Sequence, residues 1–154
     1  MAAGSLVGGR FRMVVRRLSP GKSSSRRAWA TTRHRPSGAF YAFASGVHYV
    51  GVDRKTPDGI KAVRLSRELK PLRERYQQPS HERLADWTVS FDTALVERIA
   101  TEIAAPLGFA RVDFLFAPDG ACFLNEVTLT PGNAGNYMHP ELDLMLGRMW
   151  SKLL

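Results

Sequence analysis

Two acidic residues, Asp113 and Glu126, lie in strand-like segments on either side of a predicted turn. The segments are residues 111–116 (RVDFLF) and 122–128 (CFLNEVT), both rich in aromatic and β-branched side chains. Between them, Asp119–Gly120 is the residue pair preferred in a two-residue hairpin turn. With this pair as the loop, the spacing predicts that the two carboxylates face each other across a β-hairpin.

The period of two along each strand adds further side chains to the face that holds the two carboxylates. They are Arg111, Leu115, Leu124 and Thr128, with Arg111 opposite Thr128. The leucines indicate poor hydration, and like charges directly opposite each other destabilise a sheet. Two carboxylates and a hydroxyl are hard oxygen ligands of the kind that Mg²⁺ uses together with water and phosphates. The face therefore favours a Mg²⁺–phosphate site, and the alternative is a surface hairpin whose acidic groups point into water.

A glycine-rich segment, residues 129–136 (LTPGNAGN), directly follows the second of these strands. Glycines allow backbone N–H groups to approach an anion closely. Such a loop is common in proteins, so its value as a signal comes from its position immediately after the carboxylate-bearing strand.

Upstream segments must supply the rest of the sheet. Residues 39–44 and 47–52 are aromatic and β-branched runs about a Ser-Gly turn, which predicts a hairpin. Residues 53–90 are polar and irregular, with an expected turn at 57–59 and a short helix over 65–76.

One strong helix pattern follows this polar region. Ser90 or Asp92 can cap the helix start, and residues 106–108 (PLG) should end it. Apolar residues recur at helical spacing, which marks the face that packs on the core: Leu95, Val96, Ile99, Ala100 and Ile103.

Composition restricts the class of protein. The chain has 154 residues with 22 Lys+Arg and 14 Asp+Glu, a size typical of one small domain. No apolar run approaches the ~18 residues of a membrane-spanning helix. A single cysteine, Cys122, excludes an intramolecular disulfide framework and a cysteine-rich zinc site. These features predict a cytoplasmic protein without a transmembrane segment.

The positive charge is concentrated at the amino terminus. Residues 1–52 contain nine basic and no acidic side chains, whereas residues 53–154 contain 13 basic and 14 acidic ones. The arm can be interpreted as a transit peptide, a nucleic-acid-binding arm, a phosphate loop or a solvated remnant. Arg16 stands where a phosphate loop needs its first glycine, and few aromatic residues are interleaved with the basic ones. We therefore expect a solvated arm and no specific nucleic-acid partner.

Three sequence segments carry a resemblance to a known superfamily. Residues 111–114 (RVDF), 119–120 (DG) and 124–132 (LNEVTLTPG) resemble the carboxy-terminal core of ATP-grasp enzymes, notably D-alanyl-D-alanine ligases. They are more similar still to the TupA-like ATP-grasp family, which is linked to teichuronopeptide and cell-surface polysaccharide biosynthesis. Residues 40–46 and 143–150 are also similar to elements of that family.

The resemblance implies roles for individual residues. Asp113 and Glu126 would be magnesium ligands, with Glu126 bridging two ions, and Arg111 would stabilise a phosphorylated intermediate. Leu124 would form the floor of the adenine pocket. Thr128 stands where the ligases have an asparagine ligand, so its contact with the bound nucleotide and metal would be weaker.

The resemblance also implies a fold and an activity. Residues 38–154 would form an α+β ATP-grasp carboxy-terminal subdomain, a mainly antiparallel sheet with flanking helices, after a basic arm of residues 1–37. The amino-terminal nucleotide subdomain would be largely missing, and Ala39 replaces a lysine that is usual in the family. The implied activity is ATP- and Mg²⁺-dependent ligation of an unidentified carboxylate or amine acceptor.

Two other functions remain open. In the first, the domain has no catalytic activity and binds a nucleotide or a partner. In the second, the basic arm carries the function and binds nucleic acid or acidic glycan. If half of the nucleotide clamp is missing, binding of Mg²⁺–ATP should be weak.

Overall fold

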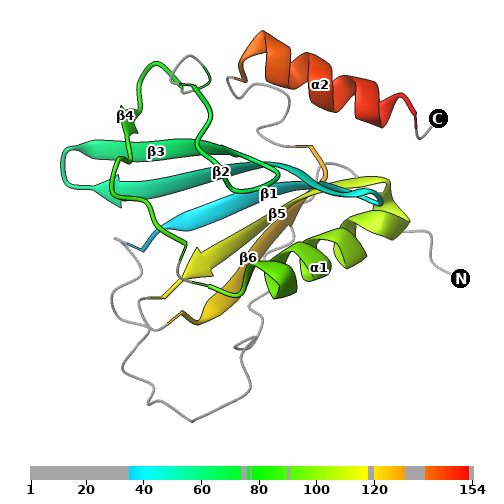
Figure 1. Cartoon of the computed structure of the whole chain (residues 1–154), viewed down its shortest axis with the longest axis horizontal. Helices are drawn as coiled ribbons and strands as arrows, with labels where there is room; N and C mark the ends of the chain where they lie inside the picture. The colour runs from blue at the N-terminus through cyan, green and yellow to red at the C-terminus, as the bar shows by residue number, and fades with distance from the viewer. Residues whose placement is uncertain are drawn as a thin grey trace, which may run out of the picture.

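A six-stranded mixed sheet with two helices forms the core of the structure (Figure 1). The computed structural model describes residues 35–73, 76, 78–89, 91–117, 120–130 and 138–152. The strands are β1 (Ser37–Phe43), β2 (Gly46–Thr56), β3 (Gly59–Ser66), β4 (Glu82–Arg83), β5 (Phe109–Phe116) and β6 (Cys122–Thr128). Their order in the sheet is β4-β3-β2-β1-β5-β6, and only the β3–β4 pair is parallel. The helices are α1 (Thr93–Ala104), the short 3-10 helix η4 (Ala105–Leu107) and α2 (Pro140–Trp150). The predicted α+β class is confirmed.

Both predicted hairpins form, because each has a turn that joins two runs with strand propensity. β1 and β2 pair antiparallel about the Ser-Gly turn, where Gly46 has a φ of 115° that favours glycine. β5 and β6 pair antiparallel as expected, but the two-residue loop predicted between them is wrong, because Phe116 pairs with Cys122 and the N–H of Ala117 donates to the carbonyl oxygen of Ala121 at 2.8 Å. In the turn between them Gly120 has a φ of 78°, whereas Asp119 lies outside the described residues.

The helix predicted over residues 65–76 is wrong. Residues up to Ser66 belong to β3, where Leu65 pairs with Val50 of β2 and is fully buried. Beyond β3 the chain turns back on itself: the N–H of Leu69 donates to the carbonyl oxygen of Ser66 at 3.0 Å, and Leu69 has a φ of 58°, which a helix does not allow. The expectation of irregular structure over residues 53–90 is correspondingly wrong for β3.

The predicted helix at residues 93–104 is confirmed as α1. The Asp92 side chain caps it by accepting a hydrogen bond from the backbone N–H of Leu95 at 3.0 Å. η4 and Gly108, with a φ of 77°, end it near the predicted position. Its buried residues are Val96, Ala100 and Ala104.

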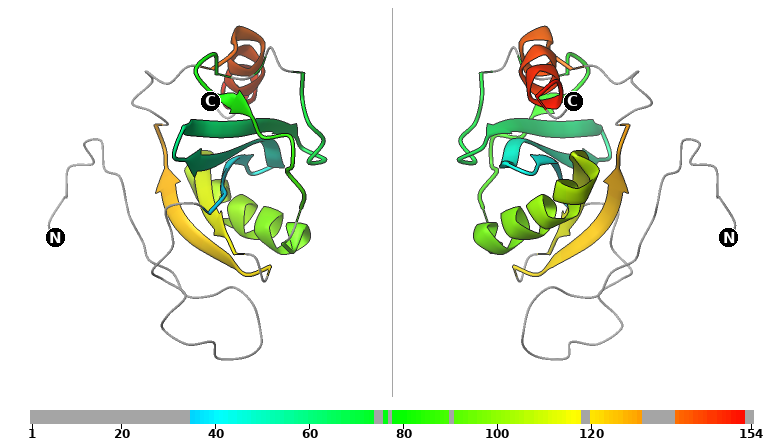
Figure 2. Two further views of the ribbon diagram at one scale, coloured as in Figure 1. Left: turned by 90° about the vertical axis from the view of Figure 1, so that its left-hand side faces the viewer. Right: turned by 90° about the vertical axis from the view of Figure 1, so that its right-hand side faces the viewer.

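The two helices cover opposite faces of the sheet, as both views in Figure 2 show. α1 packs on one face in the main core with Val50, Val112 and Phe114, all fully buried. On the other face, Leu142 and Leu146 of α2 pack on a smaller cluster with Phe43, Tyr49 and Phe109. That cluster occupies one end of the face. The rest of the face is polar and is available for a site.

Removing the cap of α1 should destabilise the protein. We expect Asp92→Ala to lower the free energy of unfolding by about 1 kcal/mol, because the N–H of Leu95 loses its acceptor. Urea denaturation of both proteins measures the change. Asp92→Asn is the matched control, since asparagine caps equally well and should leave stability close to wild type. A loss of the same size in Asp92→Asn would show that the charge, not the hydrogen bond, matters.

Candidate functional site

A row of paired residues crosses five strands on the sheet face opposite α1. From β3 to β6 it consists of Arg64, Gly51, Ala39, Asp113 and Glu126. One end of the row is a cation, the other end is a pair of carboxylates, and the middle holds the two smallest side chains. The middle of the row therefore forms a low floor between charged groups.

A cavity of about 250 Å³ lies over this floor. Along the strands, Tyr41 and Tyr49 form the next row on one side, and Ser37 and Asp53 form the next row on the other. Residues from outside the sheet also line it: Tyr76, Gln78, His81 and Met138. The sheet thus presents a polar cavity with a row of two tyrosines along one side and an Arg–Asp ion pair at each end, Arg64–Asp53 and Arg111–Asp113.

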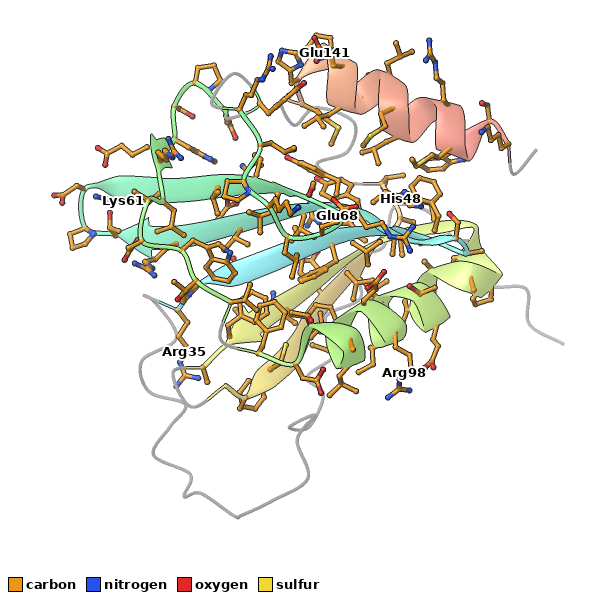
Figure 3. All side chains as sticks on the ribbon, in the orientation of Figure 1. Arg35, His48, Lys61, Glu68, Arg98 and Glu141 are labelled. Atoms are coloured by element: carbon orange, nitrogen blue, oxygen red, sulfur yellow. The ribbon has the colours of Figure 1, made fainter. Side chains whose placement is uncertain are left out.

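The start of α2 is tied to this cavity. The hydroxyl of Tyr76, which lines the cavity, donates a hydrogen bond of 2.5 Å to Glu141 in the first turn of α2 (Figure 3). The Tyr76 ring also contacts that of His139, the N-cap residue of α2. These contacts hold the cavity wall and α2 together.

The four predicted site residues on β5 and β6 come together in the predicted register. Asp113 faces Glu126, and Arg111 faces Thr128. Nε and Nη2 of Arg111 donate to the two carboxylate oxygens of Asp113, each at 2.9 Å. The Thr128 hydroxyl donates to Oε1 of Glu126 at 3.2 Å. Arg111 therefore neutralises one of the two opposed charges.

The fifth predicted residue, Leu124, does not join this group. The register shifts by one residue next to the carboxylate pair, so Leu124 pairs with Phe114 and not with Leu115. The shift leaves Asn125 as an extra residue in β6, and such a bulge moves the side chains beyond it to the other face. Leu124 is 6% exposed in the core beneath α1. Its predicted place on the carboxylate face is wrong, and it cannot form the floor of a pocket there.

Burial controls the electrostatics of the carboxylate pair. The side chains of Arg111 and Asp113 are each 15% exposed. Burial raises the pKa of Asp113 to about 6, Arg111 opposes this rise, and the charge of Glu126 adds to it. Asp113 is thus mostly ionised at neutral pH and mostly protonated at pH 5.

The opposite end of the cavity was not predicted. Nη1 of Arg64 lies 2.6 Å from Oδ1 of Asp53, and the Arg64 side chain is 12% exposed. The sequence pattern around Arg64 indicated irregular structure, so nothing placed it beside a cavity. The alternation of apolar residues across β3, at Val63 and Leu65, is the signal that could have placed Arg64 on the opposite face.

The donor chemistry of the carboxylate end fits Mg²⁺. Asp113, Glu126 and Thr128 supply oxygen atoms of the type that Mg²⁺ prefers, and phosphates and water would complete its shell. Arg111 would have to release at least one oxygen of Asp113. Within the described ranges no group of three His, Cys, Asp or Glu side chains that could hold a metal is found. The site therefore suits a metal that arrives with phosphate, not one held by protein alone.

Other predicted features fall outside the described residues. They are the basic arm up to residue 34 and most of the glycine-rich loop, residues 131–137. Among the described helices, none has the length and apolar character needed to cross a membrane.

Comparison of this chain with protein-family models, with curated proteins and with solved structures finds no match. Its function must therefore be argued from the charges and geometry of its own cavity.

Proposed function

We propose that the cavity binds Mg²⁺–ATP and that the protein is a cytoplasmic ligase of the ATP-grasp type. It would join a carboxylate to an amine in the synthesis of a cell-surface polysaccharide or peptide. The observation that supports the proposal is the opposed pair Asp113 and Glu126. Asp113 and Arg111 are largely buried and line the cavity, and Glu126 lies on the next strand, beyond the lining residues. Arg111 offsets the charge of Asp113, and a bound cation would offset the repulsion between the two carboxylates more fully.

Each residue would contribute a separate part of the chemistry. Asp113 and Glu126 would hold Mg²⁺, which supplies charge neutralisation to the phosphates when bound. Arg111 would turn from Asp113 towards the phosphoryl group and stabilise the charge that develops during its transfer. Thr128 would keep Glu126 oriented through the hydrogen bond from its hydroxyl. The row of tyrosines would exclude water from the cavity.

Titration calorimetry tests the proposal through its dependence on metal. We expect ATP to bind at least about tenfold more tightly with Mg²⁺ present than in EDTA, because the carboxylate pair repels a bare triphosphate. We also expect a Kd weaker than roughly 1 μM, because the described contacts come mainly from one face of a sheet. Equal binding of ATP in EDTA would contradict the proposal.

A second function, a nucleotide-binding module without catalysis, is favoured by one observation. Ala39 occupies the middle of the row, where the ATP-grasp resemblance implies a lysine, so the floor carries no cation of its own. Release of ADP separates the two functions. Wild type that binds Mg²⁺–ATP and releases ADP on addition of carboxylates and amines, with loss of release in Arg111→Met, supports the ligase. Binding without any release of ADP supports the module.

A further inference from the structure

Arg64 has no part in the chemistry proposed above, yet its charged group points into the same cavity. The side chain of Arg64 crosses β2 at Gly51, its partner in the sheet, where no side chain blocks its way. A Cβ atom at position 51 would lie 3.3 Å from Nη1 and 3.6 Å from Cζ of Arg64. The glycine therefore lets the guanidinium lie flat over the strand and brings its charge towards the cavity floor.

The protein uses only part of the hydrogen-bonding capacity of Arg64. Nη1 donates to Oδ1 of Asp53 at 2.6 Å and reaches the carbonyl oxygen of Val63 at 3.5 Å, and the guanidinium also contacts the Tyr49 hydroxyl. A guanidinium has five N–H groups in a planar fork that suits carboxylate and phosphate. These described partners leave N–H groups available towards the cavity.

His81 supplies a second sign of a ligand in the same cavity. Its side chain lines the cavity, whereas its Nδ1 is shielded from solvent without a hydrogen-bond partner among the described residues, so a ligand in the cavity would meet this atom only after the ring turns. A buried polar atom without a partner is costly, so such atoms usually meet a water or a ligand. Arg64 and His81 thus offer two polar groups that no described side chain satisfies completely.

This cationic end is too far from the carboxylate pair for one small group to contact both. The Arg64 guanidinium lies over β2, and Asp113 is on β5, two strands further across the sheet. Two strand spacings are about 10 Å. A ligand that contacts both ends must therefore be extended, or two ligands must bind side by side.

We propose that Arg64 and His81 form a second anion subsite, which binds a carboxylate or phosphate group separate from the phosphate at the metal end. Within the ligase proposed above, on which this reading of the ligand rests, the group would belong to the extended or acidic substrate. Asp53 is the positioning residue that holds the guanidinium in place. The competing explanation is that Arg64 and Asp53 form only a structural ion pair.

Anion titrations of the full chain distinguish these explanations. The probes are pyrophosphate and succinate, each titrated by calorimetry in EDTA at constant ionic strength, so that the metal end does not contribute. We expect at least one probe to bind wild type. Arg64→Gln should weaken the affinity for that probe by about tenfold or more, because charge-assisted hydrogen bonds are lost. Binding of pyrophosphate alone identifies a phosphate group, and binding of succinate alone identifies a carboxylate.

Matched variants control for net charge and for folding. Arg54→Gln removes the same charge from the neighbouring strand, where Arg54 pairs with Asp86 at 2.8 Å away from the cavity lining, and should leave the affinity unchanged. His81→Ala keeps Arg64 and should weaken the same probe, which preserves the test if Arg64→Gln fails to fold. The proposal is overturned if neither probe binds wild type, or if folded Arg64→Gln or His81→Ala binds the probes as wild type does.

The proposed function is read out independently in Glu126→Gln. That variant should lose the binding of Mg²⁺–ATP while it retains the binding of the probe in EDTA. Wild type that binds the probe through Arg64 but does not bind Mg²⁺–ATP would contradict the ligase and leave the anion subsite standing.

Discussion

Replacing Glu126 with glutamine should abolish the stabilisation that Mg²⁺–ATP gives to the protein. At a ligand concentration of 100 times Kd this stabilisation amounts to about 2.7 kcal/mol by mass action. The variant loses it because one of the two carboxylates that would hold the metal is gone. The apo protein should stay as stable or gain on the order of 1 kcal/mol, since the repulsion of Asp113 is relieved. Thermal melts with and without Mg²⁺–ATP at neutral pH measure both effects.

The two effects have opposite signs only if Glu126 has a ligand-binding role. A structural glutamate would show the reverse, with marked destabilisation of the apo protein and an unchanged response to ligand. Glu102→Gln is the surface control, because Glu102 pairs with Arg98 along the exposed side of α1 at 3.2 Å. It should leave the response to Mg²⁺–ATP intact. If Glu126→Gln markedly destabilises the apo protein and Mg²⁺–ATP still stabilises it as it does wild type, the metal-site assignment is wrong.

The carboxylate pair was predictable because its geometry depends on local sequence. The strand propensity of β5 and β6 predicts the hairpin, and the predicted pair Asp113 and Glu126 is found. The two-residue turn does not fix this pair, because Phe116 next to the turn pairs with Cys122 and not with Phe123, and the extra residue Asn125 restores the predicted register only at Glu126. Leu124 is predicted on the wrong face because the pairing between the turn and Leu124 differs by one residue from the predicted register, and the bulge at Asn125 restores that register only beyond Leu124. The bulge allows Leu124 to pack beside Phe114 under α1, a long-range contact that the hairpin sequence does not encode.

The cationic end is as local in the sequence as the carboxylate pair, because Arg64 pairs with Gly51 across the β2–β3 hairpin just as Asp113 pairs with Glu126 across the β5–β6 hairpin. Arg64 reaches the cavity only because β3 pairs with β2 in the register that places it opposite Gly51. Local helix propensity beyond Leu65 pointed to a different structure for this region, and tertiary pairing outweighed it. The row that spans five strands depends in addition on the pairing of β1 with β5, which are far apart in the sequence and whose register no local spacing indicates.

Asp113 should give the apo protein and its complex opposite dependences on pH. The folded-state pKa of Asp113 is raised to about 6, chiefly by burial, whereas the unfolded chain has the ordinary value of about 3.9. Between these values the folded protein retains a proton that the unfolded chain has lost. The contribution of Asp113 to stability is therefore fully present below pH ~4 and is lost as pH rises through ~6, by on the order of 3 kcal/mol.

Binding of metal and nucleotide should show the reverse trend, because only the ionised Asp113 can hold Mg²⁺. Stabilisation by Mg²⁺–ATP should thus decline as pH falls through about 6. Urea denaturation across this pH range, with and without ligand, gives the free energy of unfolding of wild type and of Asp113→Asn. The difference between the two free energies isolates the contribution of Asp113, because the other titrating groups contribute equally to both proteins. In the apo proteins the difference should fall with rising pH, and Asp113→Asn should not respond to ligand at any pH. A difference that does not vary with pH would show that Asp113 titrates as an ordinary exposed carboxylate, and the buried acidic pair could not then be the basis of a metal site.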